Sequence, residues 1–294
     1  MADQYDSRVR MVRMDDGVRL RTWTTGSPAG RPAVLLVHGG PGLWDYLEPV
    51  AALLEPLTTV HRFDQRGCGG SEESDEHTFT RYFSDVETLR RHWGHERWVV
   101  IGHSFGATLA LAYAVSYPRR TAALGYLSGV GVGDWRTAYR AESRRRMTPA
   151  QQHRLTVLSA SDTRTAAEEI EFRALCWFTD YADPVEGWRL AVADARRPER
   201  INAVANRLLS AEGRDWESPR ILDRLGGLDV PARFIHGTAD PRPGETVRRL
   251  AAAVPGAEFR LLDGAGHEPW IERRELLRAE LAELLDATPC GGDR

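Results

Sequence analysis

Lysine is absent from this chain of 294 residues, and all 39 basic residues are arginine. We attribute this bias to genome composition rather than to function. The arginines are nearly balanced by 42 acidic residues, so the formal net charge is −3. A chain without a basic excess gives no reason to expect nucleic acid or an anionic membrane as a partner.

Cysteine is scarce as well, and the sequence has no long apolar run. Cys68, Cys176 and Cys290 are odd in number and widely spaced, so they predict neither a disulfide framework nor a metal cluster. No segment approaches the roughly 18 apolar residues that span a bilayer. The first ten residues are polar and charged, unlike a signal or transit peptide. We therefore expect a cytoplasmic protein that uses no metal or other cofactor.

The order of apolar patterns along the chain predicts an α/β fold. The expected strands cover residues 9–14, 18–24, 33–38, 58–63, 98–102, 121–128, 232–236 and 258–262. The first two flank a short turn and predict a hairpin. Helical segments are expected at residues 45–55, 80–93, 109–115, 245–253 and 272–285. Buried strands that alternate with helices predict an eight-stranded, mostly parallel sheet with helices on both faces.

The segment 134–218 interrupts this alternation. It is rich in Arg, Glu and Ala, has helical periodicity and contains no strand-like run. It predicts a helical cap inserted after the sixth strand, with a core domain formed by residues 1–133 and 219–294. Ligands bind at the carboxyl edge of open α/β sheets, and this cap would lie over that edge.

The pentapeptide Gly-His-Ser-Phe-Gly at residues 102–106 lies between a buried strand and an alanine-rich helix. This is the context of a nucleophile elbow, in which two glycines allow a sharp turn and the serine stands above the sheet. The hydroxyl then lies near the positive end of the helix. Ser104 is therefore the predicted nucleophile.

A serine hydroxyl needs a base to remove its proton, and the base needs a carboxylate to orient it. In this fold the chain order is Ser, then Asp or Glu, then His. Asp240 and His267 each follow one of the two late strands, so both are expected at the same sheet edge as Ser104. Asp263 is a rival acid, but it lies too close to His267 in the sequence and on the wrong loop.

The glycine-rich stretch at residues 38–42, His-Gly-Gly-Pro-Gly, follows the third strand. Acyl transfer creates an oxyanion, and one preorganised N–H donor is worth roughly 3–4 kcal/mol. We expect the N–H groups of Gly40 and of Phe105, the residue after the nucleophile, to form the oxyanion hole. His38 is expected to brace this loop.

Together these motifs resemble the proline iminopeptidase branch of the α/β-hydrolases, which is peptidase family S33. The resemblance rests on residues 38–42, 64–71 (Asp-Gln-Arg-Gly-Cys-Gly-Gly-Ser), 102–111 and 264–267, and it covers most of 30–130 and 230–285. It implies the α/β-hydrolase fold, with the triad and the oxyanion hole at the five positions named above. The segment that begins at Asp64 is a loop support in such enzymes.

Two features depart from that family. Its elbow usually reads Gly-Gly-Ser-Trp-Gly, whereas Gly-His-Ser-Phe-Gly is commoner among esterases of the fold. The family also holds the free ammonium of its substrate with glutamates of the cap. This chain has Asn202 at one such position, and at the other Trp177 is followed by Phe178. Alternative carboxylates in the cap are Glu168, Glu171, Asp180 and Glu212.

The sequence predicts a metal-independent serine hydrolase that cleaves a small amide or ester through an acyl-enzyme, as proline iminopeptidases do. We expect Trp44, Trp177 and Phe178 to contact the substrate, which is a small molecule or a short peptide. One alternative is a carboxylesterase or lactonase for a hydrophobic metabolite. Another is a ligand-binding protein or a lyase of the same fold, since fold does not determine function. The sequence leaves the oligomeric state open.

Overall fold

The computed structural model describes residues 9–27 and 30–289, so Cys290 lies outside the described part. Eight strands form one sheet in the order β1-β2-β4-β3-β5-β6-β7-β8. Their bounds are β1 Arg10–Arg13, β2 Arg19–Thr25, β3 Val34–Val37, β4 Val60–Phe63, β5 Trp98–His103, β6 Thr121–Leu127, β7 Ala232–Gly237 and β8 Glu258–Leu262. Only the pairs β1–β2 and β2–β4 are antiparallel. The predicted eight-stranded, mostly parallel sheet is confirmed.

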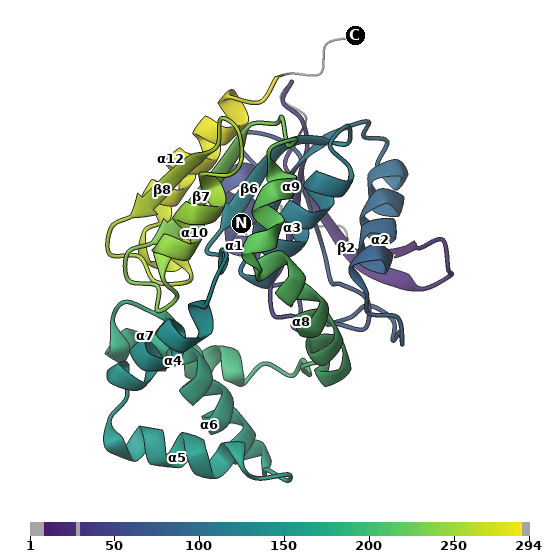
Figure 1. The fold of residues 1–294 in the computed structure, drawn as a ribbon. Coiled ribbons are helices and arrows are strands. Elements are labelled where there is room, and N and C mark those ends of the chain that lie inside the picture. The colour runs from purple at the N-terminus through teal and green to yellow at the C-terminus, as the bar shows by residue number, and fades with distance from the viewer. Residues whose placement is uncertain (1–8, 28–29, 290–294) are drawn as a thin grey trace, which may run out of the picture.

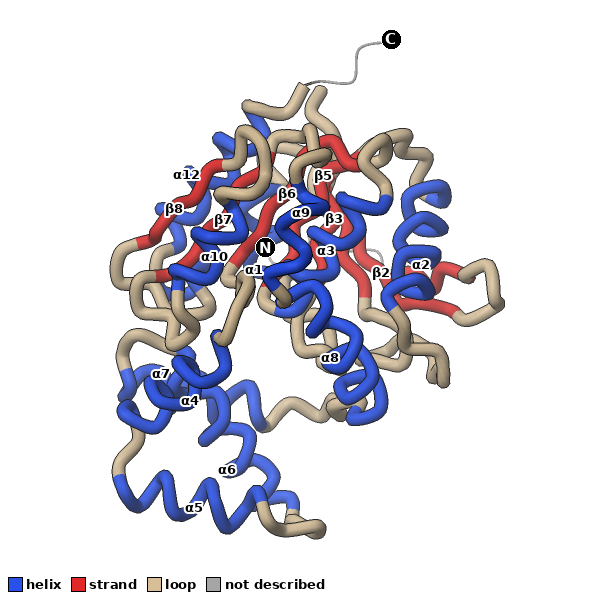
Figure 2. Tube along the Cα trace, in the orientation of Figure 1, coloured by secondary structure: helices blue, strands red, loops and turns tan. Residues whose placement is uncertain are grey.

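Helices cover both faces of this sheet (Figure 1). The helices α1 (Glu48–Leu54) and α12 (Arg274–Asp286) pack on one face. On the other face lie α2 (Phe79–His92), α3 (Phe105–Ser116) and α10 (Gly244–Ala251). Figure 2 shows the strands as a twisted layer between these helices. The strands β3 to β7 are buried along their whole length, because helices cover both faces of the sheet.

The structure adds detail at two of the expected helices. The helix that includes residues 109–115 begins at Phe105, directly after the predicted nucleophile. The helix expected at 272–285 is α12, and a short helix, α11 (Pro269–Glu272), precedes it. They are separated at Arg273, whose φ of −139° is not helical.

The segment between β6 and β7 is helical, as expected. It contains α4 Trp135–Arg146, α5 Pro149–Ser159, α6 Ala166–Trp177, η1 Phe178–Asp180, α7 Pro184–Ala195, α8 Ala203–Glu217, η2 Pro219–Ile221 and α9 Leu222–Leu225. Figure 1 shows α4 to α7 as a group beyond one edge of the sheet, with α8 running from that group towards α9. The helices α5 to α7 enclose an apolar cluster of their own, whereas Ala205, Leu209 and Trp216 of α8 pack into the main core.

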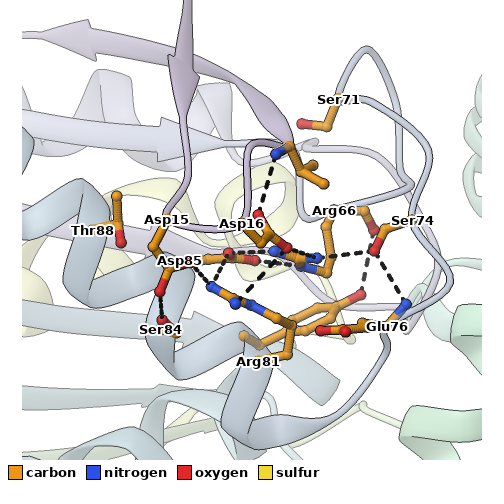
Figure 3. A network of polar contacts seen from close by, with 12 residues as sticks. Asp15, Asp16, Arg66, Ser71, Ser74, Glu76, Arg81, Ser84, Asp85 and Thr88 are labelled. Carbon is orange, nitrogen blue, oxygen red and sulfur yellow. Dashed lines mark hydrogen bonds and ion pairs between the residues drawn. The ribbon is translucent and has the colours of Figure 1, made fainter.

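The loop after β4 is held by a buried charge network (Figure 3). The side chain of Arg66 is fully buried and makes two hydrogen bonds, of 2.7 and 2.6 Å, to the carboxylate of Asp85 on α2. It also donates to Asp16 and Ser74, at 2.9 Å each. Arg66 therefore joins the N-terminal hairpin, this loop and α2, and the motif that contains it supports the loop, as the resemblance implies.

Cys68 and Cys176 are free thiols. Within residues 9–27 and 30–289, no helix is both long enough and apolar enough to cross a membrane.

Candidate active site

The turn between β5 and α3 holds Ser104 in an unusual backbone conformation. Ser104 has φ 57° and ψ −122°, which a non-glycine residue adopts only where the surrounding structure enforces it. The flanking glycines make the turn possible, because a side chain at Gly102 would collide with the carbonyl of Gly106 and one at Gly106 with that of Val37. The strand and the helix therefore approach closely, and Ser104 stays partly exposed.

The loops after β7 and β8 bring Asp240 and His267 together. Oδ2 of Asp240 lies 2.7 Å from Nδ1 of His267, and both side chains are buried. The rival Asp263 instead accepts a hydrogen bond from Thr238 at the surface. Among the described residues, no hydrogen bond joins the Ser104 hydroxyl to His267. Such contacts often tighten only when substrate binds.

The carboxylate of Asp240 determines the tautomer of His267. An ionised carboxylate only accepts hydrogen bonds, so Nδ1 of His267 carries the proton and Nε2 keeps a lone pair. Burial alone would raise the pKa of Asp240, but His267, His236 and Arg242 outweigh burial and hold that pKa well below its ordinary value. His267 is thereby prepared to accept a proton at Nε2.

A series of hydrogen bonds, here named the His103 relay, links His267 to the glycine-rich loop. Nε2 of His103 donates to the His267 carbonyl at 2.9 Å. Burial lowers the pKa of His103 far below its ordinary value, so the ring is neutral and Nδ1 is an acceptor. The Tyr46 hydroxyl donates to that Nδ1 at 2.7 Å and accepts from the Gly39 N–H at 2.9 Å. The relay is Gly39, Tyr46, His103 and His267.

His38 orients the peptide between Gly39 and Gly40. The Gln65 N–H donates to Nε2 of His38 at 3.0 Å, so Nδ1 carries the proton and donates to the Gly39 carbonyl at 2.9 Å. The N–H of a trans peptide points away from its carbonyl, so the same contact fixes the direction of the Gly40 N–H. This loop lies beside the nucleophile, because a side chain on Gly39 would come within 2.9 Å of Cβ of Ser104.

Phe105 opens α3, and its N–H is one of those that a helix leaves without an internal partner. Its side chain is buried and packs edge-on against Phe79, with 5.9 Å between ring centroids. The two predicted oxyanion donors therefore come from the segment beside Ser104 and from the residue directly after it.

The three aromatic residues expected to contact substrate have different surroundings. Trp44 and Trp177 meet edge-on, with 6.5 Å between ring centroids. The indole N–H of Trp44 is buried and has no hydrogen-bond partner among the described residues. Phe178, by contrast, packs against Trp188 inside the cap and is 2% exposed. The ring of Phe178 fills the apolar cluster of the cap, and its contact with substrate stays a prediction.

Charged residues join the cap to the acid–histidine pair. The Asp180 carbonyl accepts a hydrogen bond of 2.7 Å from the His267 N–H. The carboxylate of Asp180 lies 2.9 Å from Arg242, which lies 3.3 Å from the carboxylate of Asp240. The guanidinium of Arg242 is also stacked over Tyr139 of α4, at 4.6 Å. Sequence reasoning did not assign Arg242 a role, because Asp180 and Arg242 are 62 positions apart.

Two carboxylates with a raised pKa, Glu268 and Asp194, also escaped sequence reasoning. Burial, and to a smaller extent the charges of Asp194 and Asp180, raise the pKa of Glu268 to about 8. Burial raises the pKa of Asp194 as well. Glu268 keeps part of its surface accessible and directly follows His267 in the chain. That position was the signal in the sequence that could have identified it.

The cap carboxylates proposed from the sequence have other partners. Glu168 closes the capping box at the start of α6, Glu171 pairs with Arg154, and Glu212 accepts the N–H of Phe79. Only Asp180, of that set, reaches the acid–histidine pair. Residues 9–27 and 30–289 contain no group of three or more His, Cys, Asp or Glu that could hold a metal ion.

Comparison with known proteins places this geometry in a family. Residues 34–280 match the Alpha/beta hydrolase family. The chain belongs to that family. This α/β-hydrolase is 24% identical over 291 residues to a proline iminopeptidase of Lactobacillus delbrueckii subsp. lactis. The match covers 88% of this chain and 92% of the relative. The resemblance inferred from the motifs is thus confirmed.

Other relatives are more similar over shorter stretches. A proline iminopeptidase of Xylella fastidiosa (strain Temecula1) is 39% identical over 118 residues, and a Mycoplasma pneumoniae relative is 38% identical over 111. This α/β-hydrolase matches only 37% and 36% of the lengths of those two proteins. The crystal structure of a Mycobacterium smegmatis proline iminopeptidase superposes with a TM-score of 0.69 at 21% identity, covering 95% of this chain and 97% of the other. That similarity shows the fold.

Proposed function

We propose that this protein is a serine hydrolase that cleaves a small amide through an acyl-enzyme, in the manner of a proline iminopeptidase. The observation that carries the proposal is the 2.7 Å contact between Asp240 and His267 on loops that meet the elbow of Ser104. Serine, histidine and aspartate in this relationship are the parts that nucleophilic acyl transfer needs.

The first step forms a bond between Oγ of Ser104 and the carbonyl carbon of the substrate, and the serine proton passes to Nε2 of His267. The oxyanion faces the N–H groups of Gly40 and Phe105. Collapse breaks the C–N bond, and His267 returns the proton to the leaving amine. Water then repeats the sequence on the acyl-enzyme, with His267 again taking the proton, and releases the carboxylic acid. Asp240 stays ionised throughout because its pKa is low.

We further propose that the substrate carries a free ammonium group. Burial, and after it the negative charges of Asp194 and Asp180, raise the pKa of Glu268 to about 8. A cation among them would offset that repulsion and allow Glu268 to ionise. The names of the relatives agree with an aminoacyl substrate. Asn202 does not take this role, since its amide is used within the protein fold.

Labelling and substrate comparison test both parts of the proposal. A fluorophosphonate should label the wild-type protein and the control Ser116→Ala, at the exposed far end of α3, but not Ser104→Ala. A folded wild type that resists labelling would sink the hydrolase proposal. For the substrate, hydrolysis of prolyl and alanyl arylamides is compared with that of their N-acetyl forms and of short acyl nitrophenyl esters. Preference for the free arylamides supports the ammonium; preference for acetylated substrates or esters rejects it.

A further inference from the structure

Helix α8 of the cap contacts the glycine-rich loop immediately after Gly40. Nδ2 of Asn206 donates to the Pro41 carbonyl at 2.8 Å, and the backbone N–H of Asn202 donates to the Gly42 carbonyl at 2.8 Å. The approach is close, because a side chain on Gly42 would collide with the carbonyl oxygen of Asn202. Two successive peptide groups of the loop are therefore held from the cap.

The side chain of Asn202 sets the position of α8 relative to the core. Its Oδ1 accepts the Ala205 N–H at 2.9 Å and so caps the start of the helix. Its Nδ2 donates to the Gly67 carbonyl at 2.9 Å, in the loop after β4. Because both ends of the amide are used, Asn202 ties the first turn of α8 to a second fixed loop.

The same helix also contacts the other predicted oxyanion donor. A side chain on Gly213 of α8 would come within 3.0 Å of the ring of Phe105, so this glycine permits close packing. Trp216 of α8 stacks on Phe79, against which Phe105 packs edge-on. One helix thus lies against both segments that would supply the oxyanion hole.

Gly40 needs such external support. It is exposed, and its φ of 128° lies in a region that glycine enters freely. His38 holds the peptide before Gly40, and Asn206 holds the carbonyl of the residue after it. Without the second contact, rotation at Gly40 would be restrained on one side only.

We propose that α8 is a positioning element for the oxyanion hole, with Asn206 and Asn202 as its positioning residues. This inference rests on the proposed function, because it assumes that the Gly40 N–H meets the oxyanion. It assigns the cap a part in transition-state stabilisation that is separate from substrate binding.

Asn206→Ala is the principal test. Alanine keeps the helix propensity of α8 and removes the donor to the Pro41 carbonyl. We expect kcat/KM for an arylamide to fall about 10- to 100-fold, less than the roughly 10²- to 10³-fold loss of a whole oxyanion donor. Affinity for a trifluoromethyl ketone analogue, whose hemiketal places an oxyanion in the hole, should fall by the same factor. KM and the inhibition constant of the product amine should stay within about twofold, since neither reports an oxyanion.

Arg207→Ala, an exposed position on the same helix, is the matched control and should leave all four values unchanged. Asn202→Asp provides a second variant, because it keeps the helix cap but loses the donor to Gly67; we expect a smaller, parallel loss in kcat/KM and ketone affinity. If both asparagine variants fold and keep wild-type ketone affinity, α8 has no positioning role, whatever their thermal stability. If the fluorophosphonate fails to label wild-type Ser104, the proposed function fails instead, so the two failures are distinguishable.

Discussion

The two halves of the candidate site are supported by different chemistry. The half that holds Asp240 and His267 is joined to the cap by charges, through Asp180 and Arg242. The half that holds Ser104 and the glycine-rich loop is held by neutral donors and acceptors: the His103 relay, His38 and the asparagines of α8. Each half therefore depends on the cap, but only the first does so through full charges.

The difference follows from what each half must do. Asp240 has to remain ionised in a buried place, and neighbouring positive groups lower its pKa against the effect of burial. An oxyanion hole has to present fixed dipoles to a charge that exists only briefly, which neutral, directional hydrogen bonds accomplish. The comparison predicts that variants of the charged half change stability and charge state, whereas variants of the neutral half change geometry.

The largest effect is expected from Asp240→Asn. The amide can no longer hold the proton-bearing Nδ1 of His267 in place, and the wrong tautomer is favoured, so kcat should fall about 10⁴-fold. Steady-state kinetics and the rate of fluorophosphonate labelling measure this loss. Asp263→Asn, on the neighbouring loop, is the control and should retain activity. Equal losses in the two variants would show that Asp240 has no special role.

The next largest effect is expected from Asp180→Asn, which breaks the charged half at the cap. Arg242 would then be buried with the Asp240 carboxylate as its remaining partner. Removal of one member of a buried ion pair typically costs about 3 kcal/mol or more in the free energy of unfolding. Urea denaturation measures the change, with Asp183→Asn, at the exposed start of α7, as a comparison for cap carboxylates. A loss below about 0.5 kcal/mol would contradict a structural ion pair here.

A smaller effect is expected from Tyr46→Phe in the neutral half. The variant leaves the Gly39 N–H without an acceptor and Nδ1 of His103 without a donor. An unsatisfied buried group costs about 1–3 kcal/mol, so we expect roughly tenfold slower acylation with little change in KM. Tyr139→Phe, on the charged half, keeps its ring under Arg242 and should retain near wild-type acylation. If Tyr139→Phe slowed acylation more than Tyr46→Phe, the His103 relay would not position the glycine-rich loop.

A more gradual effect, spread over several pH units, is expected in the pH dependence of stability. The pKa of Glu268 is raised from 4.5 to about 8, so between these values the folded state binds more protons than the unfolded state. The free energy of unfolding should therefore fall as pH rises through this window, by at most about 1.4 kcal/mol per pH unit. Glu268→Gln should flatten the dependence, whereas Glu275→Gln, exposed on α12, should not. Denaturation curves at pH 5.5, 7 and 8 measure it, and parallel profiles for wild type and Glu268→Gln would rule out this assignment.

The sequence predicted the parts of the site that are governed by local rules. Strand, glycine turn and helix around Ser104 follow from spacing alone, and Asp240 and His267 follow from chain order in this fold. His103 and Arg242 were not predicted to have a role, because their contacts join segments far apart in the chain. Phe178 was predicted to contact substrate together with Trp177. Successive residues near a helix end point in different directions, and only Trp177 meets Trp44.

The division of the cap between two apolar clusters has a consequence for modular exchange. Residues 149–195 enclose their own cluster, whereas α8 packs into the main core and touches the glycine-rich loop. A chimaera that replaces α5 to α7 with helices of another origin should keep its loop support as long as α8 is retained. The donor segment must then supply a carboxylate opposite Arg242 and a carbonyl opposite the His267 N–H, as Asp180 does here. Exchange of this part of the cap is thus constrained at the position of Asp180.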